Sequence, residues 1–380
     1  MEHQTCRRCV MDDTDPDFHL DSNGVCQVCI EAEQKLPMFT FTEGVERINL
    51  ELLKSKILQR KSGEYDSILG LSGGVDSSYV ALLAMEMGLN PLCVHFDNGW
   101  NSDTAVKNIR KIIDVTGFDL HTYVIDWPEF RDLQRAFLKA SVLDIEILTD
   151  HAIFAALFKI RKQYGIKTVL SGTNYTTEHG MPSSWLWNKM DVTNIKAIHK
   201  RFGEMTMKSF PTMNTLSWLI MRKLRIGGIF EEPLNIVNYR KSDAMTQLKS
   251  TFEWEYYGGK HYESTFTKFY QAYILPTKFG IDKRRAHLSS LIVSKQLLRE
   301  DAIIELNKPA YNQEQFAVDY DFVIKKLGFT KDEFELLMDE KPISHTYYGT
   351  QWDKNEFRKY YYFKLISNPF LKLYNIFVKK

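Results

Sequence analysis

EYDSILGLSGGVDSSY, the sequence of Glu64–Tyr79, is the stretch that decides the fold. An apolar run at Ile68–Leu71, typical of a buried strand, gives way to the Gly- and Ser-rich segment Ser72–Ser78, and a helical pattern follows. A strand that passes through such a turn into a helix binds phosphate, because the glycines expose backbone N–H groups and the helix N-terminus carries partial positive charge. The stretch therefore predicts a phosphate site at a strand end, with a hairpin or linker as the alternative.

The loop lacks both common phosphate signatures, Gly-x4-Gly-Lys-Ser/Thr and Gly-x-Gly-x-x-Gly. It resembles the Ser-Gly-Gly-x-Asp-Ser loop of the PP-loop ATP pyrophosphatases. That resemblance implies that ATP is split between its α- and β-phosphates to adenylate an oxygen, and that a nitrogen or sulfur nucleophile then displaces AMP. The groups expected to hold the leaving pyrophosphate are the backbone amides of Gly73, Gly74 and Val75 and the hydroxyls of Ser72, Ser77 and Ser78. Asp76 would be repelled by bare phosphate, so we expect it to act through Mg²⁺.

The composition describes a globular protein. A chain of 380 residues suggests two or three structural units at roughly 150 residues each. The net charge of +1 gives no reason to expect a nucleic-acid partner. The N-terminus lacks the basic start and apolar run of a secretion signal, and no uncharged apolar run reaches the length of a transmembrane helix. We therefore expect a soluble, cytoplasmic protein.

The cysteines are concentrated at the N-terminus. Cys6-x2-Cys9 and Cys26-x2-Cys29 are separated by 16 residues, a spacing typical of a four-cysteine zinc site. Because all four positions are Cys, the Zn²⁺ is expected to be structural, with no place left for water. An iron–sulfur cluster, disulfides and free thiols are the alternatives, although a cytosolic setting disfavours disulfides.

Strand and helix patterns alternate after the loop. Strands are expected at Ser67–Leu71, Pro91–Phe96, Leu120–Ile125 and Thr168–Ser171, with helices between them. The alternation predicts an α/β fold with a parallel sheet and a ligand site beyond the carboxyl ends of its strands.

Polar residues follow three of these strand ends. They are Ser72–Ser78, Asp97-Asn98-Gly99 and Gly172-Thr173-Asn174. The resemblance to the PP-loop enzymes implies that Asp97 lies near the adenosine and that Gly172-Thr173-Asn174 lies near the α-phosphate and the acceptor. A turn role for Asp97 and a helix-cap role for Asn174 are the alternatives. Asp150 is either the N-cap of a helix or a second acidic group that faces the metal or the acceptor.

The segment Trp254–Ser290 combines basic and aromatic residues with Gly and Pro turns. It predicts a catalytic cap over an anionic substrate, with plain amphipathic helices as the alternative. The candidate catalytic residues in this cap are Lys260, His261, Lys283 and Arg284.

A family resemblance rests on these segments together. The paired N-terminal cysteines, LSGGVDSS, VHFDNGW, SGTNYTTE, KHYESTFTKFYQAYILP and KFGIDKRRAHLSSLI resemble the N-acetyl sugar amidotransferase family of WbpG-like and PseA-like proteins, over residues 1–310. The resemblance implies that ATP adenylates the acetamido oxygen of a nucleotide-linked N-acetyl sugar and that ammonia then forms an acetamidino group, in lipopolysaccharide O-antigen or related glycan biosynthesis. It also implies a separate glutaminase and an ammonia-channel subunit, both similar to imidazole-glycerol-phosphate synthase components.

The remaining cysteine bears on the ammonia source. A glutaminase within the chain would need a reactive cysteine, but Cys93 lies within an expected buried strand. The chain is therefore expected to take ammonia from solution or from a partner. A PP-loop tRNA thiolase is the main alternative function, disfavoured because no cysteine follows Cys93 and because 49 basic residues nearly balance 48 acidic ones. A non-catalytic scaffold is a further alternative.

We expect four parts along the chain: a zinc ribbon at 1–43, the PP-loop ATP-binding domain at 44–180, a helical substrate and cap region at 181–310, and a helical extension at 311–380. Gln313–Lys341 is expected to form two helices that separate at Gly328, with Thr330 as cap. Phe357–Lys380 alternates aromatic residues with Lys. We expect it to pack as a terminal helix on the body of the protein, with binding to a partner subunit or to an anionic lipid surface as the alternatives.

Overall fold

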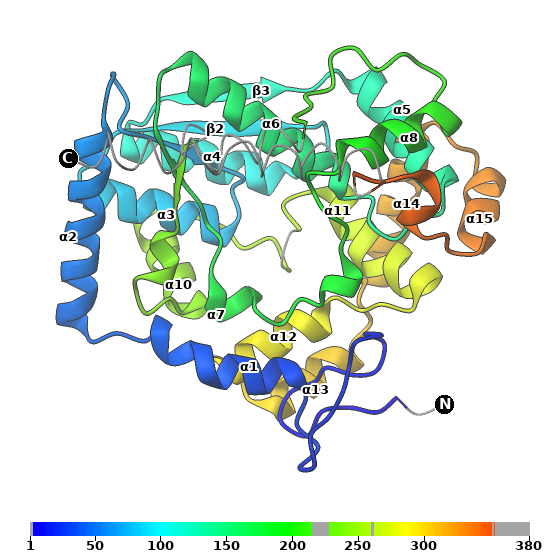
Figure 1. The fold of residues 1–380 in the computed structure, drawn as a ribbon, viewed down its shortest axis with the longest axis horizontal. Helices are drawn as coiled ribbons and strands as arrows, with labels where there is room; N and C mark the ends of the chain where they lie inside the picture. The colour runs from blue at the N-terminus through cyan, green and yellow to red at the C-terminus, as the bar shows by residue number, and fades with distance from the viewer. Residues whose placement is uncertain (1–2, 215–227, 260–261, 352, 354–380) are drawn as a thin grey trace.

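The structure is a computed structural model that describes residues 3–214, 228–259, 262–351 and 353 (Figure 1). Lys260, His261 and the stretch Phe357–Lys380 lie outside the described residues.

A five-stranded parallel sheet forms the centre of the fold, in the order β3-β2-β1-β4-β5. The strands are β1 (Ser67–Gly70), β2 (Pro91–Asp97), β3 (Leu120–Val124), β4 (Thr168–Leu170) and β5 (Ile229–Glu231). The predicted α/β class and all four predicted strands are confirmed, whereas the edge strand β5 was not predicted. The chain builds outward from β1 to β3 and then returns to the other side of β1, so the strand order reverses between β1 and β4. This reversal is where open α/β sheets bind ligands.

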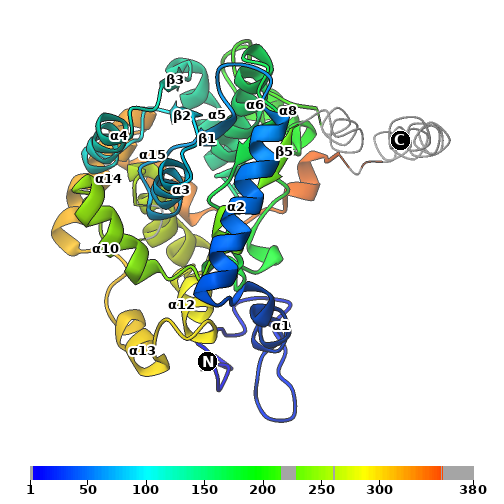
Figure 2. The ribbon, with the colours of Figure 1, turned by 90° about the vertical axis from the view of Figure 1, so that its left-hand side faces the viewer.

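Helices cover both faces of the sheet. The helices around the sheet are α2 (Glu43–Arg60), α3 (Val75–Glu86), α4 (Asp103–Thr116), α5 (Trp127–Lys139), α6 (Ile147–Gln163) and α10 (Lys241–Phe252). Side chains alternate along each strand, so Leu69 faces the core formed with α2, α3, α4 and α10, while Ile68 packs toward α6 on the other face. Figure 2 shows α3 and α4 on one side of the strands and α5 and α6 on the other.

A second, larger core joins the N-terminal cysteines to the helical C-terminal part of the chain. Its helices include α1 (Gln27–Lys35), α8 (Val192–Phe202), α11 (Thr265–Phe269), the π-helical segment Tyr270–Phe279, α12 (Arg284–Val293), α14 (Gln313–Leu327) and α15 (Lys331–Asp339). The helix α13 (Arg299–Asn307) contacts α12. Short helical turns lie at Leu36–Phe39, Tyr175–Glu178 (α7), Ser183–Trp185, Pro233–Asn235 and His345–Tyr348. The helical character of the C-terminal region is confirmed, and the four-part division of the chain stays a prediction.

The predicted break between two C-terminal helices is confirmed in detail. Gly328 ends α14 with φ of 74°, a left-handed conformation that glycine adopts without strain. The hydroxyl of Thr330 accepts from the backbone N–H of Glu333, and the Glu333 carboxylate accepts from that of Thr330, which forms a capping box for α15. None of the helices in the described ranges combines the length and the apolar character needed to cross a membrane.

Candidate functional site

The Gly-rich loop has the conformation expected of an anion-binding turn. Gly73 has φ of 80°, and a Cβ at this position would lie 2.5 Å from the carbonyl oxygen of Ala105, so both conformation and space require glycine. The Gly73 carbonyl accepts from the indole N–H of Trp254 at 3.1 Å, and α3 begins directly after the loop at Val75. The loop is therefore held from both α4 and the segment after α10.

Hydroxyl groups stabilise the interior of the loop. Ser77 Oγ accepts from the backbone N–H of Ser72 at 3.3 Å and lies 3.1 Å from the Ser72 hydroxyl. Ser72 Oγ in turn accepts from the N–H of Gly74 at 3.2 Å. Ser78 is fully buried, so its hydroxyl does not lie on the surface that the loop presents. Of the three predicted serine hydroxyls, the structure brings Ser72 and Ser77 together and directs Ser78 elsewhere.

Two tyrosines that sequence reasoning missed contact the start of α3. The Tyr239 hydroxyl donates to Asp76 Oδ1, and the Tyr257 hydroxyl accepts from the backbone N–H of Val75 at 3.2 Å. Burial raises the pKa of both phenols, helped by the charge of Asp76 at Tyr239 and of Glu263 at Tyr257. Both tyrosines therefore remain neutral hydroxyls beside the loop.

The end of β4 meets the start of α3. A Cβ on Gly172 would lie 3.2 Å from both the Cβ and the carbonyl carbon of Asp76. Thr173 follows, and its hydroxyl accepts from that of Ser171 at 2.9 Å. Asn174 Oδ1 accepts from the backbone N–H of Thr177 at 2.9 Å, so Asn174 has the helix-cap role that was its alternative.

Asp97 has the geometry of a turn residue. Its Oδ1 accepts from the N–H of Gly99 at 2.9 Å and from Asn101 Nδ2 at 3.1 Å. It lines a side hollow of about 540 Å³ between β2, β3 and α4. The ring of His95 lines both this hollow and the main cavity, and burial lowers its pKa. A role for Asp97 beside adenosine stays a prediction.

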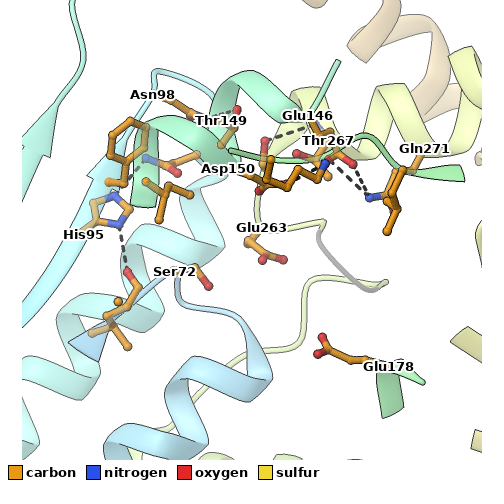
Figure 3. Close-up of a pocket in the computed structure, with 18 of the residues that line it drawn as sticks. Ser72, His95, Asn98, Glu146, Thr149, Asp150, Glu178, Glu263, Thr267 and Gln271 are labelled. Atoms are coloured by element: carbon orange, nitrogen blue, oxygen red, sulfur yellow. Dashed lines mark hydrogen bonds and ion pairs between the residues drawn. The ribbon is translucent and has the colours of Figure 1, made fainter. Parts of the chain in front are cut away.

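A cavity of about 560 Å³ opens beyond the carboxyl ends of β1 and β2 (Figure 3). Ser72 from the phosphate loop, Asp150 from α6 and Glu178 from α7 reach this cavity. Residues of the cap segment also line this cavity: Glu263, Ser264, Thr267, Gln271, Lys283 and His287. Glu263 lies directly beside the phosphate loop, since a Cβ on Gly74 would come within 3.2 Å of its Oε1. The phosphate loop and the cap therefore line one shared space.

Five charged side chains gather at the end of this cavity near α6. Lys189 Nζ lies 2.7 Å from Asp144 Oδ2 and 3.0 Å from Asp150 Oδ2. Lys283 Nζ lies 3.1 Å from Glu146 Oε2. Three carboxylates against two ammonium groups leave this end with one net negative charge. Of the five, sequence reasoning identified Asp150 and Lys283.

Asp150 and its neighbours have shifted ionisation. Asp150 lies in the first turn of α6, where Glu146 occupies the N-cap, so the N-cap alternative for Asp150 is wrong. Burial raises the pKa of Asp150, and the positive charge of Lys189 opposes that shift. Burial also disfavours a charged Asp144, but Lys189 and Lys283 outweigh it and lower the Asp144 pKa.

The structure separates the two predicted basic residues at the start of α12. Lys283 lines the cavity, with its Nζ 5.5 Å from the Tyr270 ring centre. Arg284 instead pairs with Asp282 at 2.7 Å and donates to the carbonyl of Lys308 at 2.9 Å, at the C-terminus of α13. These partners hold the guanidinium at the C-terminus of α13, and Arg284 does not line the cavity, so its catalytic role stays a prediction.

The four N-terminal cysteines form a closed cluster that fits a metal ion. The Sγ atoms of Cys6, Cys9, Cys26 and Cys29 all lie within 4.8 Å of one another, and all four residues are fully buried. Two of the separations, 3.9 Å for Cys6–Cys29 and 3.6 Å for Cys9–Cys26, agree with the S–S distance of roughly 3.8 Å around tetrahedral zinc. The backbone N–H groups of Arg8 and Cys26 point at Cys6 Sγ, as expected for a thiolate ligand.

The cysteine cluster packs against the same helix that lines the cavity. Asp12 pairs with Arg285 of α12 at 2.9 Å, and Ser289 of α12 accepts from the N–H of Val10 at 3.2 Å. Arg299 of α13 donates to the carbonyl of Cys9 at 3.1 Å. The cluster is thus a support for α12, on which Lys283 and His287 reach the cavity.

Comparisons with known proteins agree with this arrangement. Residues 263–360 match the family model described as "LPS biosynthesis protein WbpG-like, C-terminal domain", and residues 47–201 match the model described as "NAD synthase". Together the two matches support a WbpG-like member of the PP-loop family. The two matches support an ATP-using, ligase-type enzyme with a general role in lipopolysaccharide biosynthesis.

Other comparisons add little to the description of this WbpG-like protein. No curated protein matches the chain. A solved structure of NMN synthetase from Francisella tularensis is similar, at 14% identity over 56% of this chain and 94% of that chain, with a TM-score of 0.31. A score at this level supports no conclusion about the site.

Proposed function

We propose that the protein is an AMP-forming amidotransferase that converts the acetamido group of a nucleotide-linked N-acetyl sugar into an acetamidino group. The observation that carries this proposal is the shared cavity. The segment that matches NAD synthase supplies Ser72 and Asp150, and the WbpG-like segment supplies Glu263, Gln271 and Lys283. An ATP-activating loop and a glycan-specific cap facing one space fit a reaction that adenylates a sugar derivative.

In the first half-reaction, the acetamido oxygen attacks the α-phosphorus of ATP. The bond to the bridging oxygen breaks, and pyrophosphate leaves toward the amides of Gly73, Gly74 and Val75 at the start of α3. The partial positive charge of that helix N-terminus stabilises the developing charge. The product is an O-adenylyl imidate, in which the former amide carbon is open to a nucleophile.

In the second half-reaction, ammonia attacks the imidate carbon. AMP leaves with the former acetamido oxygen, and the nitrogen loses a proton to Asp150. A carboxylate whose pKa is raised by burial is a better proton acceptor near neutral pH than an ordinary one. Lys283 has a single carboxylate partner among the described residues, so its remaining N–H groups can donate to the charged acceptor. Lys260 and His261, which complete the predicted cap, belong to the same proposal.

The residues at the loop suit magnesium. Asp76 offers carboxylate oxygen, the ligand that Mg²⁺ prefers, at the junction of β1, β4 and α3. When bound there with ATP, the ion neutralises charge on the leaving pyrophosphate. Tyr239 donates to Oδ1 of the same carboxylate and would fix its orientation for the ion. The cysteine cluster is proposed to hold Zn²⁺ as a structural ion, outside the reaction.

The ammonia is proposed to come from a separate glutaminase with a channel subunit. Cys93 is fully buried in β2, and burial raises the pKa of its thiol to about 12, which is unsuited to a nucleophile. The other four cysteines belong to the metal cluster. An acceptor in surface-glycan biosynthesis and a cytoplasmic location are parts of the same proposal.

Product analysis tests the proposed reaction. Purified protein is incubated with ATP-Mg²⁺, ammonium and a panel of UDP- and CMP-linked N-acetyl sugars, and nucleotides and sugars are then identified by mass spectrometry. AMP, pyrophosphate and a sugar in which NH replaces O are expected, and Asp76→Asn is expected to form none of them. AMP that forms only with tRNA would favour thiolation, and the absence of cleavage with every acceptor would reject the proposal.

A further inference from the structure

Lys189 lies between two aspartates with very different surroundings. The side chain of Asp144 is 1% exposed, whereas that of Asp150 is 41% exposed and faces the cavity. Lys189 itself lies in the segment between the short turn Ser183–Trp185 and α8. It therefore connects a fully buried carboxylate to one that an acceptor can reach.

The ammonium group of Lys189 is engaged by two carboxylates. It donates to Asp144 Oδ1 at 3.0 Å and Asp144 Oδ2 at 2.7 Å, and it forms an ion pair with Asp150 Oδ2 at 3.0 Å. These contacts direct the ammonium group at the two aspartates. Lys189 differs in this respect from Lys283, whose one carboxylate partner among the described residues is Glu146.

Asp144 is held in place by further hydrogen bonds. Its Oδ2 also accepts from the backbone N–H of Trp187 at 2.7 Å, and its own N–H donates to Nε2 of His345 at 3.1 Å. Rotation of this carboxylate would break both of its hydrogen bonds with Lys189 and leave the buried Asp144 charge without its ion-pair partner, which is costly. Asp144 therefore fixes the position of Lys189.

We propose that Lys189, anchored by Asp144, is a positioning residue that fixes the orientation of the Asp150 carboxylate at the cavity wall and favours its ionised form. The role of Asp150 as a proton acceptor rests on the proposed function, whereas the contact between Lys189 and Asp150 is independent of it. Among the described residues, the charges that act most on Asp150 are Lys189, Glu146 and Asp144, and Lys283 pairs with Glu146. The other titratable groups that line the same cavity are Glu178, Glu263 and His287. Lys189 is the one cation in direct contact with Asp150 among the described residues.

The first experiment measures the contact without the reaction. Thermal unfolding is recorded at neutral pH for the wild type, Lys189→Met, Asp150→Asn and the double variant. We expect the double variant to lose clearly less than the sum of the single losses, because each substitution removes the same contact. The matched control is Lys268→Met, which breaks a half-buried pair with Asp319 at 2.6 Å elsewhere and is expected to add to Asp150→Asn. Additive losses for Lys189 and Asp150 would overturn the proposal.

The second experiment measures the pH profile of AMP formation. Removing the positive charge makes Asp150 harder to ionise, so the acidic limb of kcat/KM in Lys189→Met is expected to move up by about one pH unit. Lys189→Arg is expected to restore the limb, and Lys268→Met to leave it in place. An unmoved limb in Lys189→Met would overturn the positioning role. A wild type that forms no AMP would reject the proposed function, and the unfolding experiment would still decide whether Lys189 holds Asp150.

Discussion

Gly172 at the end of β4 lies so close to Asp76 that a Cβ on this glycine would come within 3.2 Å of the aspartate Cβ. The same Cβ would lie 3.2 Å from the backbone nitrogen of Ser77. The end of β4 and the start of α3 therefore meet so closely that a side chain at residue 172 would have to displace one of them.

Gly172→Ala is expected to push the start of α3 away from β4 and to weaken ATP binding by about tenfold or more. Binding of a non-cleavable α,β-methylene analogue of ATP with Mg²⁺, measured by calorimetry, checks this expectation. Gly44→Ala is the matched control, because nothing lies within 4 Å of a Cβ at that position. Equal affinity in the two variants would contradict the close contact.

The adjacent residues Lys283 and Arg284 are expected to respond differently to loss of charge. Lys283→Met removes a donor from the cavity and is expected to lower kcat/KM for AMP formation by about 100-fold. Arg284→Met loses the Asp282 pair and the carbonyl contacts at the end of α13, so stability falls while turnover stays close to that of the wild type. Assays well below both unfolding midpoints separate the two effects, and a large loss of turnover in Arg284→Met would restore its predicted catalytic role.

His345 makes stability depend on pH. It is 4% exposed, its Nε2 accepts from Asp144 N–H, and its Nδ1–H donates to Asn194 Oδ1 at 2.7 Å. Burial lowers the pKa of His345 from 6.5 to about 4, so the folded protein keeps the ring neutral. As the pH falls, the ring is protonated in the unfolded chain before it is protonated in the folded protein. The contribution of His345 to stability is therefore fully present above pH 6.5 and is lost progressively toward pH 4.

The loss attributable to this ring is on the order of 3 kcal/mol across that window. His345→Gln is expected to be less stable at neutral pH and to show a flatter decline between these pH values, as measured by chemical denaturation. His19, an exposed residue, serves as the control, and His19→Gln should follow the wild-type curve. If the stability of His345→Gln fell as steeply with decreasing pH as that of the wild type, the role given to His345 would be contradicted.

The cysteine cluster is expected to contain one zinc ion per chain and to support α12. Removal of the metal with a chelator should lower the unfolding midpoint, and Cys29→Ser should lose both metal and several kcal/mol of stability. Metal analysis and thermal unfolding measure the two effects. Cys93→Ala, which lies in β2 outside the cluster, should keep the full metal content, and an iron signal in place of zinc would revise the metal assignment.

The elements that sequence reasoning predicted well are those with local signals. The strand before the phosphate loop, the helix after it and the break at Gly328 each depend on residues within one short segment. The paired cysteines are similar, since their spacing alone indicates how four thiols can meet. The short strand β5 carries no such pattern in its three residues and takes its place by pairing with β4.

The charged end of the cavity could not be predicted in the same way. Lys189 meets Asp144 and Asp150 across about forty positions of sequence, and no local pattern marks that encounter. Tyr239 and Tyr257 likewise reach the phosphate loop from segments more than 150 residues downstream. The adjacent basic residues Lys283 and Arg284 show a second limit of the sequence. Their shared charge predicts a shared role, but the sequence does not show that the C-terminus of a neighbouring helix binds one of the two cations.

The transfer of acetamido oxygen to AMP tests the proposed chemistry most directly. The acceptor sugar is prepared with heavy oxygen in its acetamido group and incubated with the enzyme, ATP-Mg²⁺ and ammonium. We predict that the heavy oxygen appears in the phosphate of AMP and is absent from pyrophosphate, because adenylation places that oxygen on the α-phosphorus. Unlabelled AMP formed together with the amidino sugar would contradict adenylation of the acetamido oxygen.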